Sequence, residues 1–140
     1  SSRLYTHVQK ELKLVTEIGA YITGSLNDGL LIISGKLSPD VTFQQVDQAI
    51  WEVLEEIKKA PLSDHELIRL KNKISTAKAF QDKGLLNRAM NLAHFELLGD
   101  ADGINEEAQI YEAITPKHIQ DISKKILIKT NCSLLQVKAI

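Results

Sequence analysis

Several kinds of residue that anchor or cross-link proteins are scarce in this sequence of 140 residues. Cys132 is the single cysteine, so an internal disulfide is excluded. No apolar run approaches the roughly 20 residues that a membrane-spanning helix needs. The net charge of −1 argues against a surface for polyanions, which requires a clustered excess of Lys and Arg. We therefore expect a soluble protein with no nucleic-acid partner and no membrane partner.

The first residues of this sequence do not predict a signal peptide. They read Ser-Ser-Arg-Leu-Tyr, without an initiator Met and without the apolar stretch of a signal peptide. We therefore expect a processed chain, or a piece cut from something longer. The length of 140 residues is typical of one domain, so the sequence predicts a single domain over 1–140.

The sequence contains fragments of the metal-binding motif of zinc peptidases but no complete copy of it. That motif places two His one helical turn apart, with a Glu that acts as base. After His65, the position of the second His holds Arg69, a permanent cation that cannot bind zinc. His7 and Glu11 share a helix face, but a catalytic zinc site takes three protein ligands. We expect no catalytic residue and no metal ligand in this chain.

Cys132 and a group of basic residues in the middle of the chain could also carry a function, but we interpret both as structural features. Cys132 lies in a β-rich run over 132–137 with no base beside it, so we predict a buried structural thiol in a strand. The middle of the chain holds a basic group without interleaved aromatic residues, which predicts a solvated helix face. Its members are Arg69, Lys71, Lys73, Lys78, Lys83 and Arg88.

The strongest local signal is a β-hairpin. Two apolar, β-rich runs over 20–26 and 30–37 flank Asn27-Asp28-Gly29, and an Asp-Gly step supplies the positive φ of a tight reversal. Apolar residues at helical spacing over 3–17 predict a helix that leads into the first strand at Gly19. Pro39 cannot donate to a ladder and is expected to end the second strand.

Helices dominate the rest of the chain. Thr42 and Gln45 form a capping box before an apolar stripe, and Ser63 to Glu66 form a second one. Gly84 predicts a break, a short helix is expected over 105–113, and Thr115 begins a last helix. The closing strand over 132–137 is expected to join the sheet of the hairpin. The order of elements therefore predicts an α+β fold with a thin sheet and an open edge.

Four segments resemble, in the same order, segments of the insulinase/pitrilysin family of zinc metallopeptidases. This family includes the subunits of the mitochondrial processing peptidase and many bacterial zinc proteases. The segments are LKLVTEIGAY over 12–21, LNDGLLIISGKLSPD over 26–40, LSDHELIRLK over 62–71 and ITPKHI over 114–119. They span nearly the whole chain. The resemblance is to the C-terminal, non-catalytic part of such a peptidase.

The resemblance implies both a fold and a role. The fold is a two-layer α+β sandwich with a small, mostly antiparallel sheet and helices packed on one face, a partial LuxS/MPP-like metallohydrolase fold. The role is to shape the peptide-binding chamber of a zinc metallopeptidase, and the alternative is a catalytically dead scaffold or assembly subunit of the same fold. The zinc is expected in the N-terminal half of an active parent, with no cofactor in this chain.

The resemblance also implies one substrate-binding residue. In the family, an Arg and a Tyr seven residues apart bind the substrate backbone; Tyr21 stands at the Tyr position and Leu14 at the Arg position. Tyr21 is therefore the candidate for peptide binding, and a plain strand aromatic is the alternative. The implied partners are the N-terminal half of the parent or a catalytic subunit, a peptide, and a second copy through an open sheet edge. The implied compartment is the bacterial cytoplasm or periplasm.

Overall fold

The computed structural model describes residues 2–24, 27–81 and 83–138, and the chain divides into two compact units. Unit 1 comprises residues 1–60 and 123–140, and unit 2 comprises residues 61–122. None of the described helices is long and apolar enough to cross a membrane. The elements in chain order are η1 Tyr5–Glu11, β1 Val15–Ile22, β2 Leu31–Leu37, α1 Phe43–Lys59, α2 Asp64–Gln81, α3 Leu85–Leu97, α4 Gly103–Ala113, α5 Pro116–Ile126 and η2 Lys129–Asn131.

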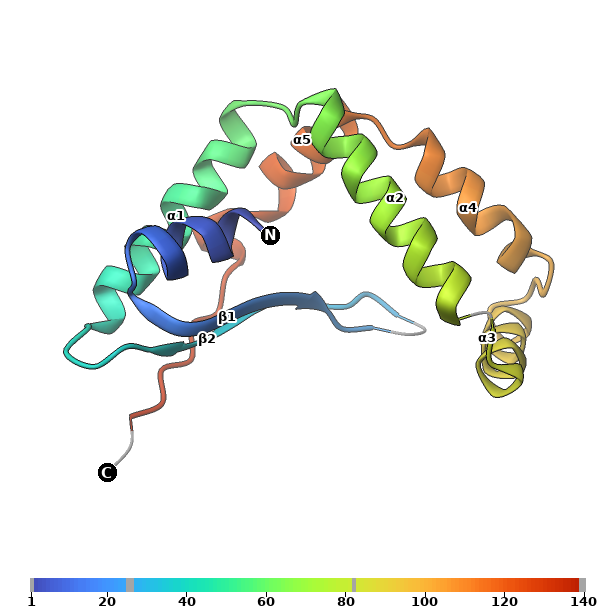
Figure 1. Ribbon diagram of the computed structural model, residues 1–140, viewed down its shortest axis with the longest axis horizontal. Helices are drawn as coiled ribbons and strands as arrows, with labels where there is room; N and C mark the ends of the chain where they lie inside the picture. The colour runs from blue at the N-terminus through green and yellow to red at the C-terminus, as the bar shows by residue number, and fades with distance from the viewer. Residues whose placement is uncertain (1, 25–26, 82, 139–140) are drawn as a thin grey trace. The chain divides into compact units, whose positions relative to one another are not determined.

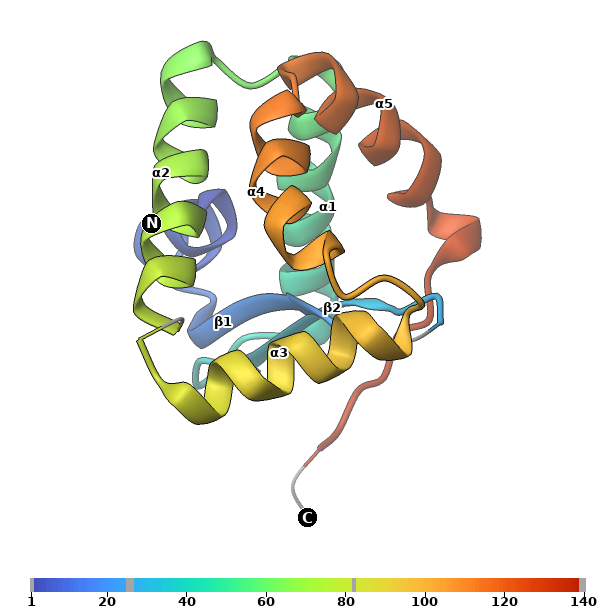
Figure 2. The same ribbon diagram turned by 90° about the vertical axis from the view of Figure 1, so that its right-hand side faces the viewer.

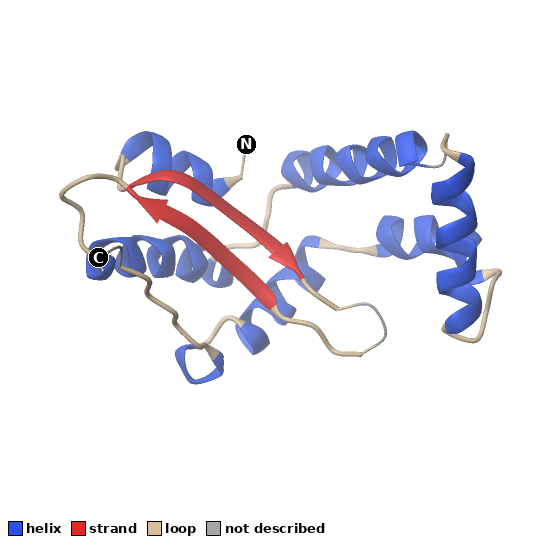
Figure 3. Cartoon of the chain, turned by 90° about the horizontal axis from the view of Figure 1, so that it is seen from below, coloured by secondary structure: helices blue, strands red, loops and turns tan. Residues whose placement is uncertain are grey.

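The predicted hairpin is confirmed. Strands β1 and β2 pair antiparallel, with Val15 opposite Leu37 and Ile22 opposite Leu31 (Figure 3). The register shifts by one residue between Val15 and Glu17, which forms a β-bulge at Thr16. The hydroxyl of Thr16 donates to the carbonyl oxygen of Lys36 at 3.2 Å, so the bulge keeps a hydrogen-bonded contact across the ladder.

The reversal of the hairpin is wider than predicted. It spans residues 23–30, of which 25 and 26 lie outside the described residues, and the positive φ falls at Gly24, with a value of 120°, rather than at Gly29. The amide of Thr23 donates to the carbonyl oxygen of Leu30 at 2.9 Å. Gly29 has another role: a Cβ built on it would lie 1.4 Å from the carbonyl oxygen of Thr23. This glycine is required by the close approach of the two chain segments.

The helix predicted over 3–17 is wrong in extent. Element η1 ends at Glu11 and is a π-helix, in which the amide of Leu12 donates to the carbonyl oxygen of His7 at 3.0 Å. Lys13 then takes a φ of 54°, which terminates the helical path, and β1 begins at Val15 rather than at Gly19. The β-branched residues at the start of β1 favour extended backbone, which outweighs the helical spacing of the apolar residues.

The core of unit 1 lies between the hairpin and two helices on one of its faces (Figure 1). It consists of Leu4, Val8, Val15, Val46, Ala49 and Val53. The predicted stripe of α1 is confirmed, and so is its capping box, in which Thr42 and Gln45 exchange side-chain to backbone hydrogen bonds. The α+β fold, with an antiparallel sheet covered by helices on one face, is confirmed.

The predicted closing strand and the predicted burial of Cys132 are both wrong. The described sheet has two strands, and residues 132–138 run without strand pairing after η2 (Figure 3). Cys132 has extended dihedral angles, with φ −124° and ψ 134°, and it is exposed. Its sequence favours extended backbone, but a strand also needs a partner for its ladder, and local sequence does not supply one.

Unit 2 contains α2, α3, α4 and the start of α5, with α2 and α4 side by side (Figure 2). The predicted caps are confirmed, because the amide of Glu66 donates to the hydroxyl of Ser63 at 3.2 Å and the amide of His118 to that of Thr115 at 3.2 Å. The predicted break at Gly84 separates α2 from α3. Each of these features depends on residues close together in sequence.

The basic helix face is less solvated than predicted. The ammonium group of Lys78 lies 2.6 Å from the carboxylate of Glu107 on α4, and Lys71 pairs with Glu112 on the same helix. The side chains of both lysines are largely covered. Their charges therefore connect α2 to α4, a pairing between distant residues that local sequence could not reveal.

Much apolar surface of unit 2 remains uncovered. Among the described residues of this unit, Leu67 is the one apolar residue that is buried, and it remains 8% exposed. Helix α3 has no buried residue, and its Leu86, Met90 and Leu97 are all more than half exposed. Exposed apolar surface of this extent is typical of a surface that contacts another chain or segment.

Candidate functional site

The hairpin has one covered face and one free face. Val15, Ile18 and Ile33 pack in or against the core of unit 1. Side chains alternate across a strand, and residues opposite each other in the register lie on the same face of the hairpin. The other face therefore carries every second pair of the register, beginning with Glu17 and Lys36. These free-face residues are Glu17, Gly19 and Tyr21 of β1, opposite Lys36, Ser34 and Ile32 of β2.

Tyr21 lies on this free face and is 52% exposed. Its cross-strand partner Ile32 is half-buried, so these two side chains form a small apolar patch on a face that is otherwise polar. Leu14, the position seven residues earlier, packs instead against the core cluster. The β-bulge at Thr16 lies between them. The structure therefore does not bring Leu14 and Tyr21 together as a pair on one face.

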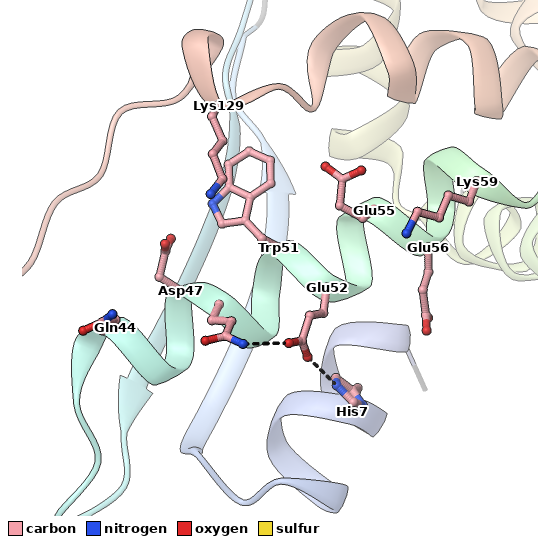
Figure 4. Close-up of a pocket in the computed structure, with 10 residues that line it drawn as sticks. His7, Gln44, Asp47, Trp51, Glu52, Glu55, Glu56, Lys59 and Lys129 are labelled. Carbon is pink, nitrogen blue, oxygen red and sulfur yellow. Dashed lines mark hydrogen bonds and ion pairs between the residues drawn. The ribbon is translucent and has the colours of Figure 1, made fainter.

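A second feature of unit 1 is an open hollow of about 880 Å³ along α1 (Figure 4). Its floor is the outer face of α1, and His7 of η1 and Lys129 of η2 lie at its sides. The Nζ atom of Lys129 lies 5.7 Å from the centre of the Trp51 ring, within the range of a cation–π interaction. Acidic residues outnumber basic ones in the lining: Asp47, Glu52, Glu55 and Glu56 against Lys59 and Lys129.

The pKa of His7, which lines the hollow, is displaced from its ordinary value. The Nδ1 atom of His7 lies 2.9 Å from the carboxylate of Glu11. Its Nε2 lies 3.7 Å from the carboxylate of Glu52 (Figure 4). The hydrogen bond with Glu11 raises the pKa of His7 above its ordinary value. Burial opposes this increase, and the contact with Glu52 adds further increases that are each smaller than the effect of burial. Gln48 steadies Glu52 by donating to its other carboxylate oxygen at 3.1 Å.

The remaining histidines do not assemble into a site. His65 is an exposed residue in the first turn of α2, and His94 stacks edge-on with Phe95 at 6.0 Å between ring centres. Within residues 2–24, 27–81 and 83–138, no group of three or more His, Cys, Asp or Glu side chains could hold a metal ion. The contact of His7 with Glu52 was missed from sequence because the two residues lie on separate elements.

These observations define an antiparallel hairpin covered by helices on one face, with an exposed second face and an open hollow along α1. The family described as "Peptidase M16 inactive domain" matches residues 1–74. The chain belongs to this family, which confirms the resemblance to the non-catalytic part of insulinase/pitrilysin peptidases. No curated protein matches the chain.

Solved bacterial structures share the fold. A protease from Helicobacter pylori superposes with a TM-score of 0.84 at 16% identity, over 94% of this chain and 32% of that one. A "putative zinc protease" from Bordetella pertussis Tohama I gives 0.81 at 22% identity, over 94% of this chain and 71% of that one. The "inactive peptidase domain of a putative zinc protease" from Bordetella parapertussis gives 0.83 at 21% identity, over 94% and 70%. The chain thus spans about a third of the Helicobacter protein and most of the other two.

Proposed function

We propose that this chain is the non-catalytic C-terminal part of a zinc metallopeptidase and shapes the chamber that binds the peptide. The observation that carries the proposal is the match to an inactive peptidase domain over residues 1–74. The free face of the hairpin supports it, because a flat sheet face with an exposed aromatic suits contact with an extended peptide.

In this proposal the residues that cleave the peptide belong to another part of the peptidase. Zinc and a general base would come from the N-terminal half of the parent or from a catalytic subunit. The described residues of this chain offer no trio of metal ligands, so they do not fit a zinc site. What this chain supplies is a surface that holds and orients substrate.

Unpaired backbone and exposed apolar residues support association with that partner. The hairpin leaves an outer edge on each of its strands, and residues 132–138 run unpaired. Edges of this kind accept further strands. The exposed face of α3 adds apolar area. The same edges could instead pair with a second copy of the chain, which would give a homo-oligomer.

The proposal is tested by mixing the purified chain with a catalytic half that carries the His-x-x-Glu-His motif. We expect the chain alone to hold no stoichiometric zinc and to cleave no peptide, and the mixture to cleave a fluorogenic peptide well above the rate of either part. Sedimentation equilibrium would distinguish the hetero-complex from self-association. Zinc-dependent cleavage by the chain alone would contradict the proposal.

Tyr21 is the substrate-contacting residue that we propose. In a full-length parent, Tyr21→Phe should reduce peptide cleavage about three- to tenfold, because a lost hydrogen bond to bound substrate is worth roughly 0.5–1.5 kcal/mol. Thermal stability should not change, because Tyr21 is half exposed and outside the core. Ser34→Ala, at another free-face position, is the matched control. Equal cleavage by wild type and Tyr21→Phe would remove this residue from the site.

A catalytically dead scaffold or assembly subunit is the second candidate. The observation that favours it is Leu14, which stands at the Arg position of the family's substrate-binding pair and packs against the core. An apolar side chain there cannot bind a peptide carbonyl. Under this alternative, the complex with the catalytic half would form and the rate of cleavage would not depend on Tyr21.

A further inference from the structure

The His7 ring lies between carboxylates from two different elements. Glu11 belongs to η1, as His7 does, and contacts Nδ1 at 2.9 Å, whereas Glu52 belongs to α1 and lies 3.7 Å from Nε2. An imidazolium has an N–H group on both nitrogens, but a neutral imidazole has only one. Only the protonated ring can therefore present a donor to both carboxylates at once.

This contact joins two elements that pack together through apolar side chains of the core. Element η1 is a π-helix, a conformation that is rare in proteins and depends on its surroundings. Its apolar face packs against α1 and β1 through Leu4 and Val8, and Gln9 donates to the carbonyl oxygen of Thr16 at 2.8 Å on the β1 side. On the α1 side, Nε2 of His7 lies 3.7 Å from the carboxylate of Glu52.

The other charged groups near His7 do not replace this contact. The lining of the same hollow includes Glu56 and Lys59 of α1, further along the helix, and Lys129 of η2, which lies over Trp51 on the opposite side (Figure 4). Asp47 and Glu55 complete the charged lining. The surplus of carboxylates favours a cation at the position of His7.

We propose that His7 is a pH-dependent clamp between η1 and α1, closed when its ring carries both protons and released when one is lost. The release would free the η1 side of the hollow while the apolar core keeps the helix in place. Because the pKa of folded His7 is raised, its stabilising contribution is complete below the ordinary histidine pKa and is lost as pH rises through the folded value.

The test is amide hydrogen exchange of η1 at about pH 5.5 and about pH 8, on either side of the ordinary histidine pKa of about 6.5, with rates corrected for intrinsic exchange. In the wild-type chain we expect η1 to open about two- to fivefold more often at the higher pH, the size typical of an exposed ion pair. In His7→Gln this dependence on pH should vanish. An equal dependence in both proteins, or none in the wild type, would overturn the clamp.

Two further variants separate a clamp from a local effect. Glu52→Gln keeps the His7–Glu11 pair but removes the charge on α1, so the response to pH should shrink to the part that the His7–Glu11 pair contributes; if it is undiminished, His7 acts only within η1 and the proposal is wrong. His65→Gln changes an exposed histidine of α2 and should leave the response intact. If His7→Gln does not fold, the NMR titration of His7 decides: its midpoint should fall in Glu52→Gln, and an unmoved midpoint refutes the clamp.

Discussion

Replacing Val53 by Asp is expected to unfold unit 1. Val53 is 2% exposed in the middle of α1, and it belongs to the cluster that joins this helix to η1 and β1. A carboxylate at this position would be buried among apolar side chains without a partner, which costs about 4 kcal/mol or more. This cost approaches the whole stability of a small domain, roughly 5–15 kcal/mol. Circular dichroism should show loss of the cooperative thermal transition.

A graded series makes this prediction quantitative. Val53→Ala removes two buried methyl groups and should lower the free energy of unfolding by about 2 kcal/mol while keeping the fold. Leu135→Asp introduces the same charge at a position that is 86% exposed and should leave the transition in place. If Val53→Asp melted like Leu135→Asp, the core assigned to unit 1 would be wrong.

The parts of this fold that the sequence predicted are those decided by neighbouring residues. The capping box of Thr42 and Gln45 and the serine cap before α2 each depend on a few consecutive positions, and the structure shows both. The stripe of α1 follows in the same way, because its apolar residues recur at the helical period. The existence of the hairpin also follows from local pattern, since its two strands adjoin one turn, but its register and its bulge were not predicted.

The parts that the sequence did not predict depend on distant partners or on competing local preferences. Leu4, Val8 and Val15 fit one helical stripe, yet Val15 begins a strand because Lys13 turns the chain between them. The run after Cys132 favours extended backbone, but pairing needs a second strand that the described chain does not place there. At the candidate site, the contact of His7 with Glu52 links separate elements, and no local spacing indicates it.

Gly29→Ala is expected to open the end of the hairpin. A methyl group on Gly29 would lie 1.4 Å from the carbonyl oxygen and 2.5 Å from the carbonyl carbon of Thr23, and neither backbone atom can yield without a shift of the chain. The shift would break the hydrogen bonds between Thr23 and Leu30, of which the amide of Leu30 to the Thr23 hydroxyl is 3.0 Å long. Losing these bonds should cost about 1–3 kcal/mol, confined to this end of the sheet.

Gly19→Ala is the matched control, because a Cβ on Gly19 meets nothing within 4 Å and this glycine has no positive φ. It should be neutral or slightly stabilising, since alanine restricts the unfolded chain more than glycine does. Amide exchange should accelerate in Gly29→Ala at Thr23, whose amide donates to the carbonyl oxygen of Leu30, and stay slow at Ser38, whose amide donates to the carbonyl oxygen of Leu14 at the other end of the hairpin. Because Tyr21 lies next to Ile22 at the affected end, the same substitution in a full-length parent should also weaken peptide cleavage. Unchanged exchange at Thr23 in Gly29→Ala would show that the reversal accommodates a side chain and that the close approach to Thr23 does not hold the hairpin together.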